Sequence, residues 1–177
     1  MNLAVPQVTD LPDVPTIAEA ASQIAARERS PVELLDLCLA RSRALDPVLN
    51  AWIALDEEGA RAEALALQDE APRGPLHGIP LGLKDIYDQK GLRTTAHSHR
   101  FVEAAPAKQD AVTAARLRAA GAILTGKLAT HEFALGGPSW DLPFPPARNP
   151  WDPERFTGGS SSGTHSRSSS RPAGSTW

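Results

Sequence analysis

The segment at residues 74–85 constrains the fold most, because it places glycines and prolines around a short apolar run at residues 79–83. A short apolar run bounded by turn residues is typical of a buried strand. The run is closed by Lys84, which is followed by Asp85. We therefore predict a buried strand that ends at a lysine.

A helix and a second apolar strand are predicted further along the chain. Residues 110–120 have the pattern of a helix, for which Asp110 is the expected N-cap. Residues 121–126 follow as a short apolar strand. A helix that leads into an apolar strand indicates a sheet with helical crossovers, so the predicted fold class is α/β.

The N-terminal part of the chain is predicted to be mainly helical. Thr16 and Glu19 stand at capping-box spacing, and Ser30 and Glu33 repeat that signal. The second helix is expected to end near Pro47, because proline disrupts helices. Taken alone, these helices could form a small bundle without catalytic chemistry. The predicted elements are helices at residues 16–29, 30–47 and 57–70, and a strand or extended segment at residues 49–55.

Composition excludes several functional classes. The 177 residues carry a net charge of −3 with no run of Lys or Arg, which argues against nucleic-acid binding. Cys38 is the single cysteine, so an internal disulfide and a cysteine zinc site are excluded. Residues 1–10 lack the features of a signal peptide, and no segment reaches membrane-spanning length. We expect a soluble, cytoplasmic protein that needs no metal or cofactor and binds no membrane.

Lys84 is the first candidate catalytic residue. Burial at the end of an apolar strand would lower the pKa of its amine, and a neutral amine near pH 7 can act as a general base. The alternative is that Lys84 ends the strand at the surface beside Asp85. On this segment alone, the surface interpretation is favoured.

The serines at residues 160–162 are the second candidate, with Ser160 first among them. Glycines on both sides of this cluster allow backbone conformations that other residues avoid. Such a loop can direct hydroxyl groups and backbone amides at a substrate. A flexible glycine-serine linker is the alternative that composition alone favours.

Other motifs do not fit their required context. Residues 159–163 fit the nucleophile elbow of α/β hydrolases, but no buried strand precedes them. His131 and Glu132 resemble half of a zinc-protease motif, but Leu135 stands where the second histidine belongs. Lys127 is predicted to be structural, and four histidines are predicted to be structural or exposed: His77, His97, His99 and His131.

In combination and order, several segments resemble the amidase signature family. The resemblance covers residues 15–164 and implies the N-terminal part of that fold, a mixed β-sheet core covered by helices. Residues 1–14 would then be an N-terminal extension. The matching segments are residues 74–80 with Lys84 and Asp85, residues 120–127, 131–134 and 148–152, and residues 158–161.

This resemblance implies a Lys-Ser-Ser mechanism for cleaving small carboxamides. Lys84 falls on the family's base, and Ser160 falls on its bridging serine, held after a cis peptide bond from Gly159. In the family mechanism, the lysine draws a proton through the bridging serine from a second serine, which attacks the amide. That second serine would lie beyond Trp177, so a truncated and inactive chain is expected. Substrate-binding residues and oligomeric state are not assigned.

Two alternatives remain open. The chain could come from the A subunit of a glutamyl-tRNA(Gln) or aspartyl-tRNA(Asn) amidotransferase, which shares the same lysine and serines but works with partner subunits. It could also be a non-catalytic fragment that merely binds. A neighbouring gene for a B or C subunit would favour the first alternative.

The polar tail at residues 165–177 differs from the rest of the chain. Relatives in the family continue here with an apolar helix. Back-translation with GC-rich codons and restoration of one lost G turns residues 165–174 into an Ala- and Val-rich helix former. We therefore predict a frameshift, which genomic sequencing past the codon for Trp177 can test.

Overall fold

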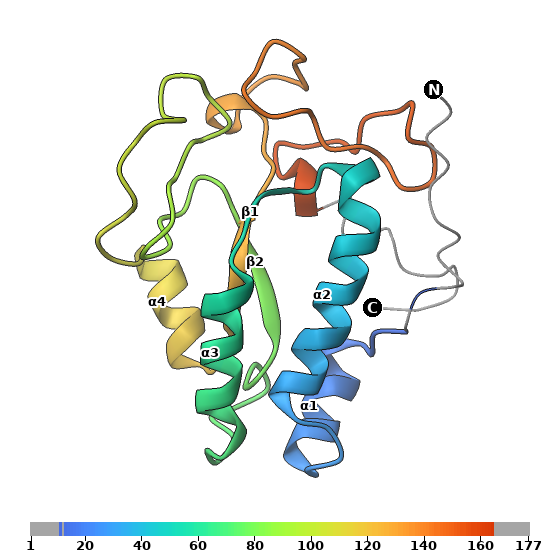
Figure 1. Ribbon diagram of the computed structural model, residues 1–177, viewed down its shortest axis with the longest axis vertical. Helices are drawn as coiled ribbons and strands as arrows, with labels where there is room; N and C mark the ends of the chain where they lie inside the picture. Colours follow the sequence, from blue (N-terminus) through green and yellow to red (C-terminus); the bar gives the residue numbers. More distant parts are fainter. Residues whose placement is uncertain (1–10, 12, 165–177) are drawn as a thin grey trace.

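The computed structural model describes residues 11 and 13–164. The predicted frameshifted tail and most of the predicted N-terminal extension lie outside these residues. Helices pack beside and behind a small sheet, and long loops gather at one end of it (Figure 1). In chain order the elements are α1 (Ile17–Ala25), α2 (Pro31–Leu49), β1 (Trp52–Leu55), α3 (Glu57–Gln68), β2 (Pro80–Lys84), α4 (Val112–Ala119) and β3 (Ile123–Leu128).

The three strands form one mixed sheet in the order β1-β3-β2. β3 is the central strand, antiparallel to β1 and parallel to β2. Helix α4 lies in the connection from β2 to β3, as a parallel pair requires. The predicted α/β class is therefore confirmed, and both predicted apolar strands are present.

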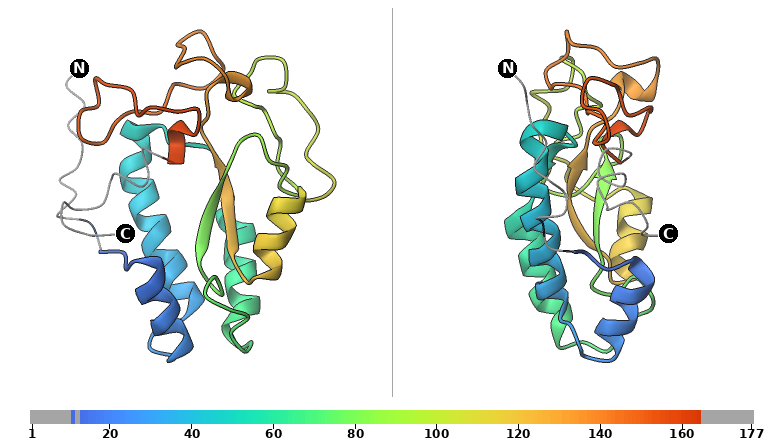
Figure 2. Two further views of the ribbon diagram at one scale, coloured as in Figure 1. Left: turned by 180° about the vertical axis from the view of Figure 1, so that it is seen from behind. Right: turned by 90° about the vertical axis from the view of Figure 1, so that its right-hand side faces the viewer.

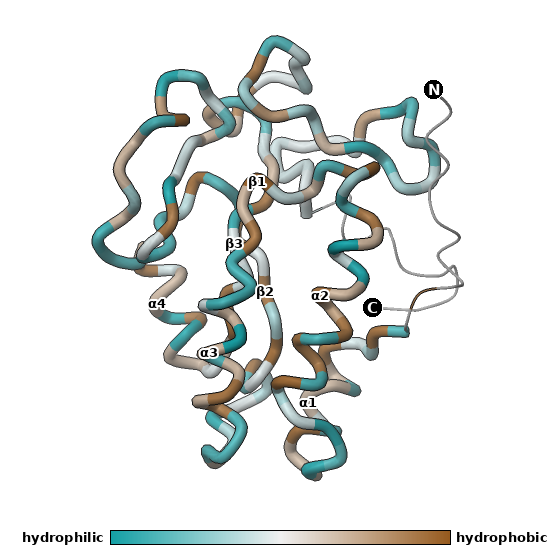
Figure 3. Tube along the Cα trace, in the orientation of Figure 1, coloured by the Kyte–Doolittle hydropathy of each residue, from teal (hydrophilic) through white to brown (hydrophobic). Residues whose placement is uncertain are grey.

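Helices cover both faces of the sheet (Figure 2). Hydrophobic and hydrophilic residues recur with the helical turn along α2 and α3, so that each helix has an apolar side to bury (Figure 3). One apolar cluster joins α2, α3 and β3, and another joins α4 to β2 and β3. Their buried members are Leu35, Leu39, Ala60, Ala64, Leu67 and Ile123 in the first cluster, and Leu83, Ala114 and Leu124 in the second.

The two predicted capping boxes are confirmed. Thr16 Oγ1 accepts the Glu19 amide at 3.2 Å, and the Thr16 amide donates to the Glu19 carboxylate at 2.7 Å. Ser30 and Glu33 make the same pair of bonds, at 3.1 and 2.7 Å. These bonds satisfy backbone donors that a helix start otherwise leaves unpaired, which fixes where α1 and α2 begin.

The predicted end of the second helix is wrong, because α2 runs through Pro47 to Leu49. A proline in the last turn forfeits one helical bond, to the carbonyl of Arg43. Val48 and Leu49, the two residues after Pro47, are buried in helical conformation, and their burial favours continuing the helix past the proline. Asn50 then ends the helix in the left-handed conformation with φ 51°.

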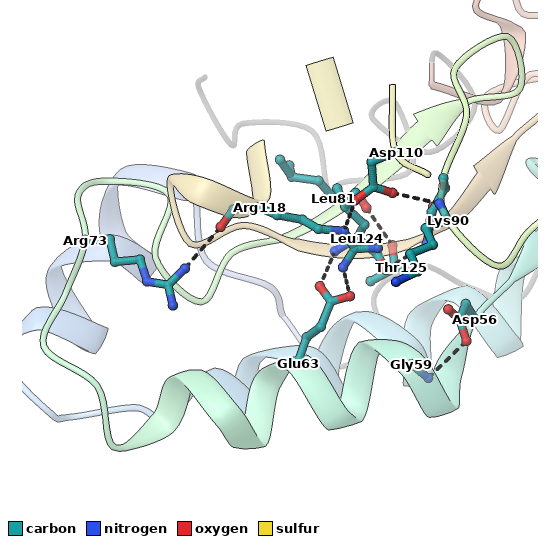
Figure 4. Close-up of polar contacts among 11 residues, drawn as sticks. Asp56, Gly59, Glu63, Arg73, Leu81, Lys90, Asp110, Arg118, Leu124 and Thr125 are labelled. Carbon is teal, nitrogen blue, oxygen red and sulfur yellow. Dashed lines mark hydrogen bonds and ion pairs between the residues drawn. The ribbon is translucent and has the colours of Figure 1, made fainter. Parts of the chain in front are cut away.

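Asp110 does not cap α4 as predicted. The N-cap is Ala111, which makes no side-chain capping bond. Asp110 instead accepts the backbone amide of Lys90 at 2.7 Å and Arg118 Nε at 2.9 Å (Figure 4). Arg118 also pairs with Glu63 on α3. The carboxylate thus joins two loops and a helix, and these tertiary partners outcompete the local cap.

An open apolar groove of about 360 Å³ lies between α1, α2 and the sheet, and residues of all three strands contribute to its lining. Leu34, Cys38, Leu81 and Leu128 are among the residues that line it. Cys38, the single cysteine of the sequence, is buried. Among the described residues, no helix is long and apolar enough to cross a bilayer.

Candidate active site

The candidate site lies where β2 and β3 end. Because these strands are parallel, their carboxyl ends meet at the same edge of the sheet. Lys84 is the last residue of β2, and Leu128, its register partner, is the last residue of β3. The chain returns to this edge in its final described residues, drawn in red in Figure 1. Two predicted site residues that are far apart in sequence are thereby brought together.

Lys84 Nζ lies 2.6 Å from Ser160 Oγ and donates a hydrogen bond to it. Partial burial lowers the pKa of Lys84 below its usual value. Among the residues that the structure describes, no carboxylate forms an ion pair with this amine. The surroundings therefore favour the neutral amine more than water does.

The backbone around Ser160 is anchored to the segment that follows β3. The Ser160 carbonyl accepts the His131 amide at 3.0 Å and Thr130 Oγ1 at 2.8 Å. The Gly163 amide donates to the Ala129 carbonyl at 2.9 Å. The peptide bond between Gly159 and Ser160 is cis, as the resemblance implied. These bonds connect the loop to the same sheet that carries Lys84.

Close packing explains the glycines of this loop better than flexibility does. A Cβ on Gly159 would lie 2.3 Å from the His131 ring, and one on Gly163 would lie 2.3 Å from the Ala51 carbonyl oxygen. Gly158 adopts φ +82°, which side chains disfavour. The linker interpretation of residues 158–163 therefore does not fit the structure.

His131 is buried beneath this loop. Its Nδ1 lies 2.9 Å from the Gly136 carbonyl oxygen, which can only accept, so Nδ1 carries the hydrogen. Nε2 then has no hydrogen-bond partner among the described residues. His97 is also buried and contacts the Phe144 carbonyl at 2.9 Å, whereas His99 is exposed. In the described part of the chain, no cluster of three potential ligands could hold a metal ion.

A second lysine lies buried beside the site. Lys127 and Asp85 form an ion pair at 2.5 Å, and both side chains are fully shielded from solvent. Leu83 and Lys127 are register partners, so Lys127 lies one position before the partner of Lys84. Successive strand residues point to opposite faces, which separates the two lysines. The sequence prediction that Lys127 is structural did not include this pair. The pair depends on a contact between residues 42 positions apart, which no local pattern in the sequence indicates.

The arrangement suits proton transfer. A neutral Lys84 amine can accept the Ser160 hydroxyl proton across 2.6 Å, while Ser160 Oγ accepts a proton from a third group. Lysine and serine alone can thus relay a proton without a metal ligand or an imidazole between them.

The chain matches the model of one protein family, Amidase, over residues 33–166. It is 43% identical over 152 residues to the A subunit of the glutamyl-tRNA(Gln) amidotransferase of Roseiflexus sp. (strain RS-1). That match covers 84% of this chain and 31% of the relative. An amidase of Pseudomonas putida is 42% identical over 148 residues, which is 81% of this chain and 30% of the relative.

Solved structures give the same picture. The peptide amidase of Stenotrophomonas maltophilia is 34% identical with a TM-score of 0.74, over 83% of this chain and 32% of that one. A crystal structure of an amidase is 40% identical with a TM-score of 0.76, over 86% and 36% of the two chains. The chain therefore spans about a third of the length of the proteins it matches.

Proposed function

Because the chain belongs to the amidase family, we propose that it carries the base and the relay of a carboxamide-cleaving site. Lys84 is the base and Ser160 is the relay. The contact of 2.6 Å between Lys84 Nζ and Ser160 Oγ is the observation that carries this proposal. Small carboxamides are the proposed substrates.

The proposed reaction needs a second serine, which we place outside residues 1–177. Neutral Lys84 takes the Ser160 proton as Ser160 takes the proton of that second serine. The freed oxygen attacks the carbonyl carbon, the C–N bond breaks, and the proton held by Lys84 returns through Ser160 to the leaving amine. Water then hydrolyses the acyl-enzyme and releases the acid. On this proposal the 177-residue chain alone is inactive.

A fusion protein tests this proposal. Residues 1–164 are joined to the part of the Pseudomonas putida amidase that this chain does not cover. Ammonia release from benzamide and indoleacetamide is then measured. We expect turnover by the fusion protein and none by the 177-residue chain. A folded fusion protein that hydrolyses neither substrate would contradict the proposal, as would hydrolysis by the 177-residue chain that Ser160→Ala abolishes.

The second candidate function is that of an amidotransferase A subunit, favoured by the Roseiflexus relative at 43% identity. The Pseudomonas putida amidase at 42% is nearly as similar, so identity does not separate the two. An A subunit would act only together with its partner subunits. A gene for a B or C subunit beside the coding sequence would favour this candidate. A free-standing gene would favour the first.

A further inference from the structure

Lys127 and Asp85 form the most enclosed charged contact described in this structure. The Lys127 ammonium donates to Asp85 Oδ1 at 2.5 Å, to Thr94 Oγ1 at 2.9 Å and to the Arg93 carbonyl at 3.1 Å. All three donors of the ammonium are thus used. Buried ion pairs often add little net stability, because desolvation offsets the attraction. A complete pair beside a candidate base therefore suggests a role beyond stability.

Asp85 is fixed through both its backbone and its side chain. Its amide donates to the Leu128 carbonyl at 3.0 Å, and its carbonyl accepts the Ala96 amide at 3.1 Å. Asp85 Oδ2 accepts the Thr95 amide at 3.0 Å and Thr95 Oγ1 at 2.5 Å. Since Asp85 directly follows Lys84, these bonds also fix the backbone from which the Lys84 side chain extends.

Among the described residues, Asp85 and Lys127 are the charged groups that the sheet places next to Lys84. On its own segment the neighbouring charge is Asp85, and β3 contributes Lys127. The loop that carries Ser160 contributes a neutral hydroxyl, and His131 lies beneath that loop. Without Lys127, the negative charge of Asp85 would therefore act on the Lys84 amine without a neighbouring positive charge to neutralise it.

We propose that Lys127 is a positioning residue for Lys84. By neutralising and holding Asp85, it keeps the Lys84 amine directed at Ser160 with no unpaired carboxylate nearby. This inference rests on the proposed role of Lys84 as the base. An unpaired Asp85 carboxylate would stabilise the Lys84 ammonium, and a base that stays protonated cannot accept the Ser160 proton.

Competitive labelling of the 177-residue chain with acetic anhydride tests this inference without any need for catalysis. Only neutral amines react, so the pH at which half of Lys84 is reactive reports its protonation, as measured by mass spectrometry of peptides. Lys90 and Lys108 are exposed and serve as references within the same sample. Lys127→Met should raise the Lys84 midpoint by about 1 pH unit and leave both references unchanged. The double variant Lys127→Met/Asp85→Asn, with neither charge, should return it close to the original value.

A folded Lys127→Met variant with an unchanged Lys84 midpoint would overturn the inference. A double variant shifted as far as the single variant would overturn it too. If Lys127→Met fails to fold, Asp85→Asn replaces it. That change leaves the Lys127 cation unpaired and should lower the Lys84 midpoint, so an unchanged or raised value would count against us. If neither single variant folds, the double variant decides. Its folding supports the claim that the Lys127 and Asp85 charges neutralise each other, and its failure to fold refutes that claim.

These results separate the inference from the proposed function. An inactive fusion protein would reject Lys84 and Ser160 as base and relay, yet the labelling midpoints would still report whether Lys127 controls the charge around Lys84. In the reverse outcome, the fusion protein is active but the Lys84 labelling midpoint does not change in the Lys127→Met variant. That result would reject the inference alone.

Discussion

Two lysines at neighbouring strand ends have opposite surroundings. Lys127 is fully buried, pairs with Asp85 and uses every donor of its ammonium. Lys84 is half-buried and bonds to the Ser160 hydroxyl. Burial beside an anion stabilises the charged form of an amine, whereas burial beside a hydroxyl does not. The same residue type therefore has an ion-pair partner on one face of the sheet and a hydroxyl partner on the other.

The largest expected effect concerns activity on the Lys84 face. In the fusion protein, Lys84→Ala should lower kcat for benzamide about 1,000-fold, because the relay loses its proton acceptor. Lys84→Arg should not restore activity, since a guanidinium stays protonated. Ammonia release measures both. Lys90→Ala, which alters an exposed lysine, is the matched control and should behave as the unmodified fusion protein. Near-normal rates for Lys84→Ala would remove the distinction between the two faces.

The second effect concerns stability, and here the change at Lys127 should be the more damaging one. Lys127→Met in the 177-residue chain should lower the free energy of unfolding by about 3–5 kcal/mol, because it leaves a buried carboxylate uncompensated. Lys84→Met should change it by less than about 1 kcal/mol, since it breaks no ion pair. Urea unfolding followed by circular dichroism compares the two variants. Equal losses at both positions would show that the ion pair does not distinguish the two lysines in stability.

A smaller difference in stability is expected between the loss of the Thr95 hydroxyl, which bonds to Asp85, and the loss of the Ser160 hydroxyl, which bonds to Lys84. Thr95→Val removes a buried donor to Asp85 and should cost about 1–3 kcal/mol of unfolding free energy. Ser160→Ala removes the half-buried partner of Lys84 and should cost less than about 1 kcal/mol. Thermal unfolding of the two variants side by side gives the ranking. If Ser160→Ala proved the more damaging change, the Ser160 loop would have a structural role that we have not assigned.

Local signals in the sequence were sufficient for much of the fold. The capping boxes at Thr16 and Ser30 act within four residues, so their spacing alone predicted where two helices begin. Both apolar strands were recognised from short runs between turn residues. The α4 cap failed because Asp110 found Arg118 and the Lys90 amide, partners that local spacing does not reveal.

The candidate site depended on contacts across the chain. Lys84 and Ser160 are 76 residues apart, and only the family resemblance linked them before the structure did. Neither the Lys127–Asp85 pair nor the packing of His131 against Gly159 was predicted. Each depends on which residues the sheet brings together, and no short-range pattern in the sequence marks such contacts. Close approach, rather than backbone freedom, proved to be the reason for Gly159.

The order of strands also bears on how the chain is made. Among the strands in the described part of the chain, β3 comes last in sequence but is central in the sheet, so β1 and β2 gain their described partner only when β3 has been synthesised. A ribosome adds about 5–20 residues per second, so several seconds pass between the synthesis of β1 and that of β3. During that interval α1, α2 and α3 can pack on one another, but neither the Lys84 face nor the Lys127 face exists. The nascent chain would therefore expose two unpaired strands for part of its synthesis, a period in which chaperones have apolar segments to bind.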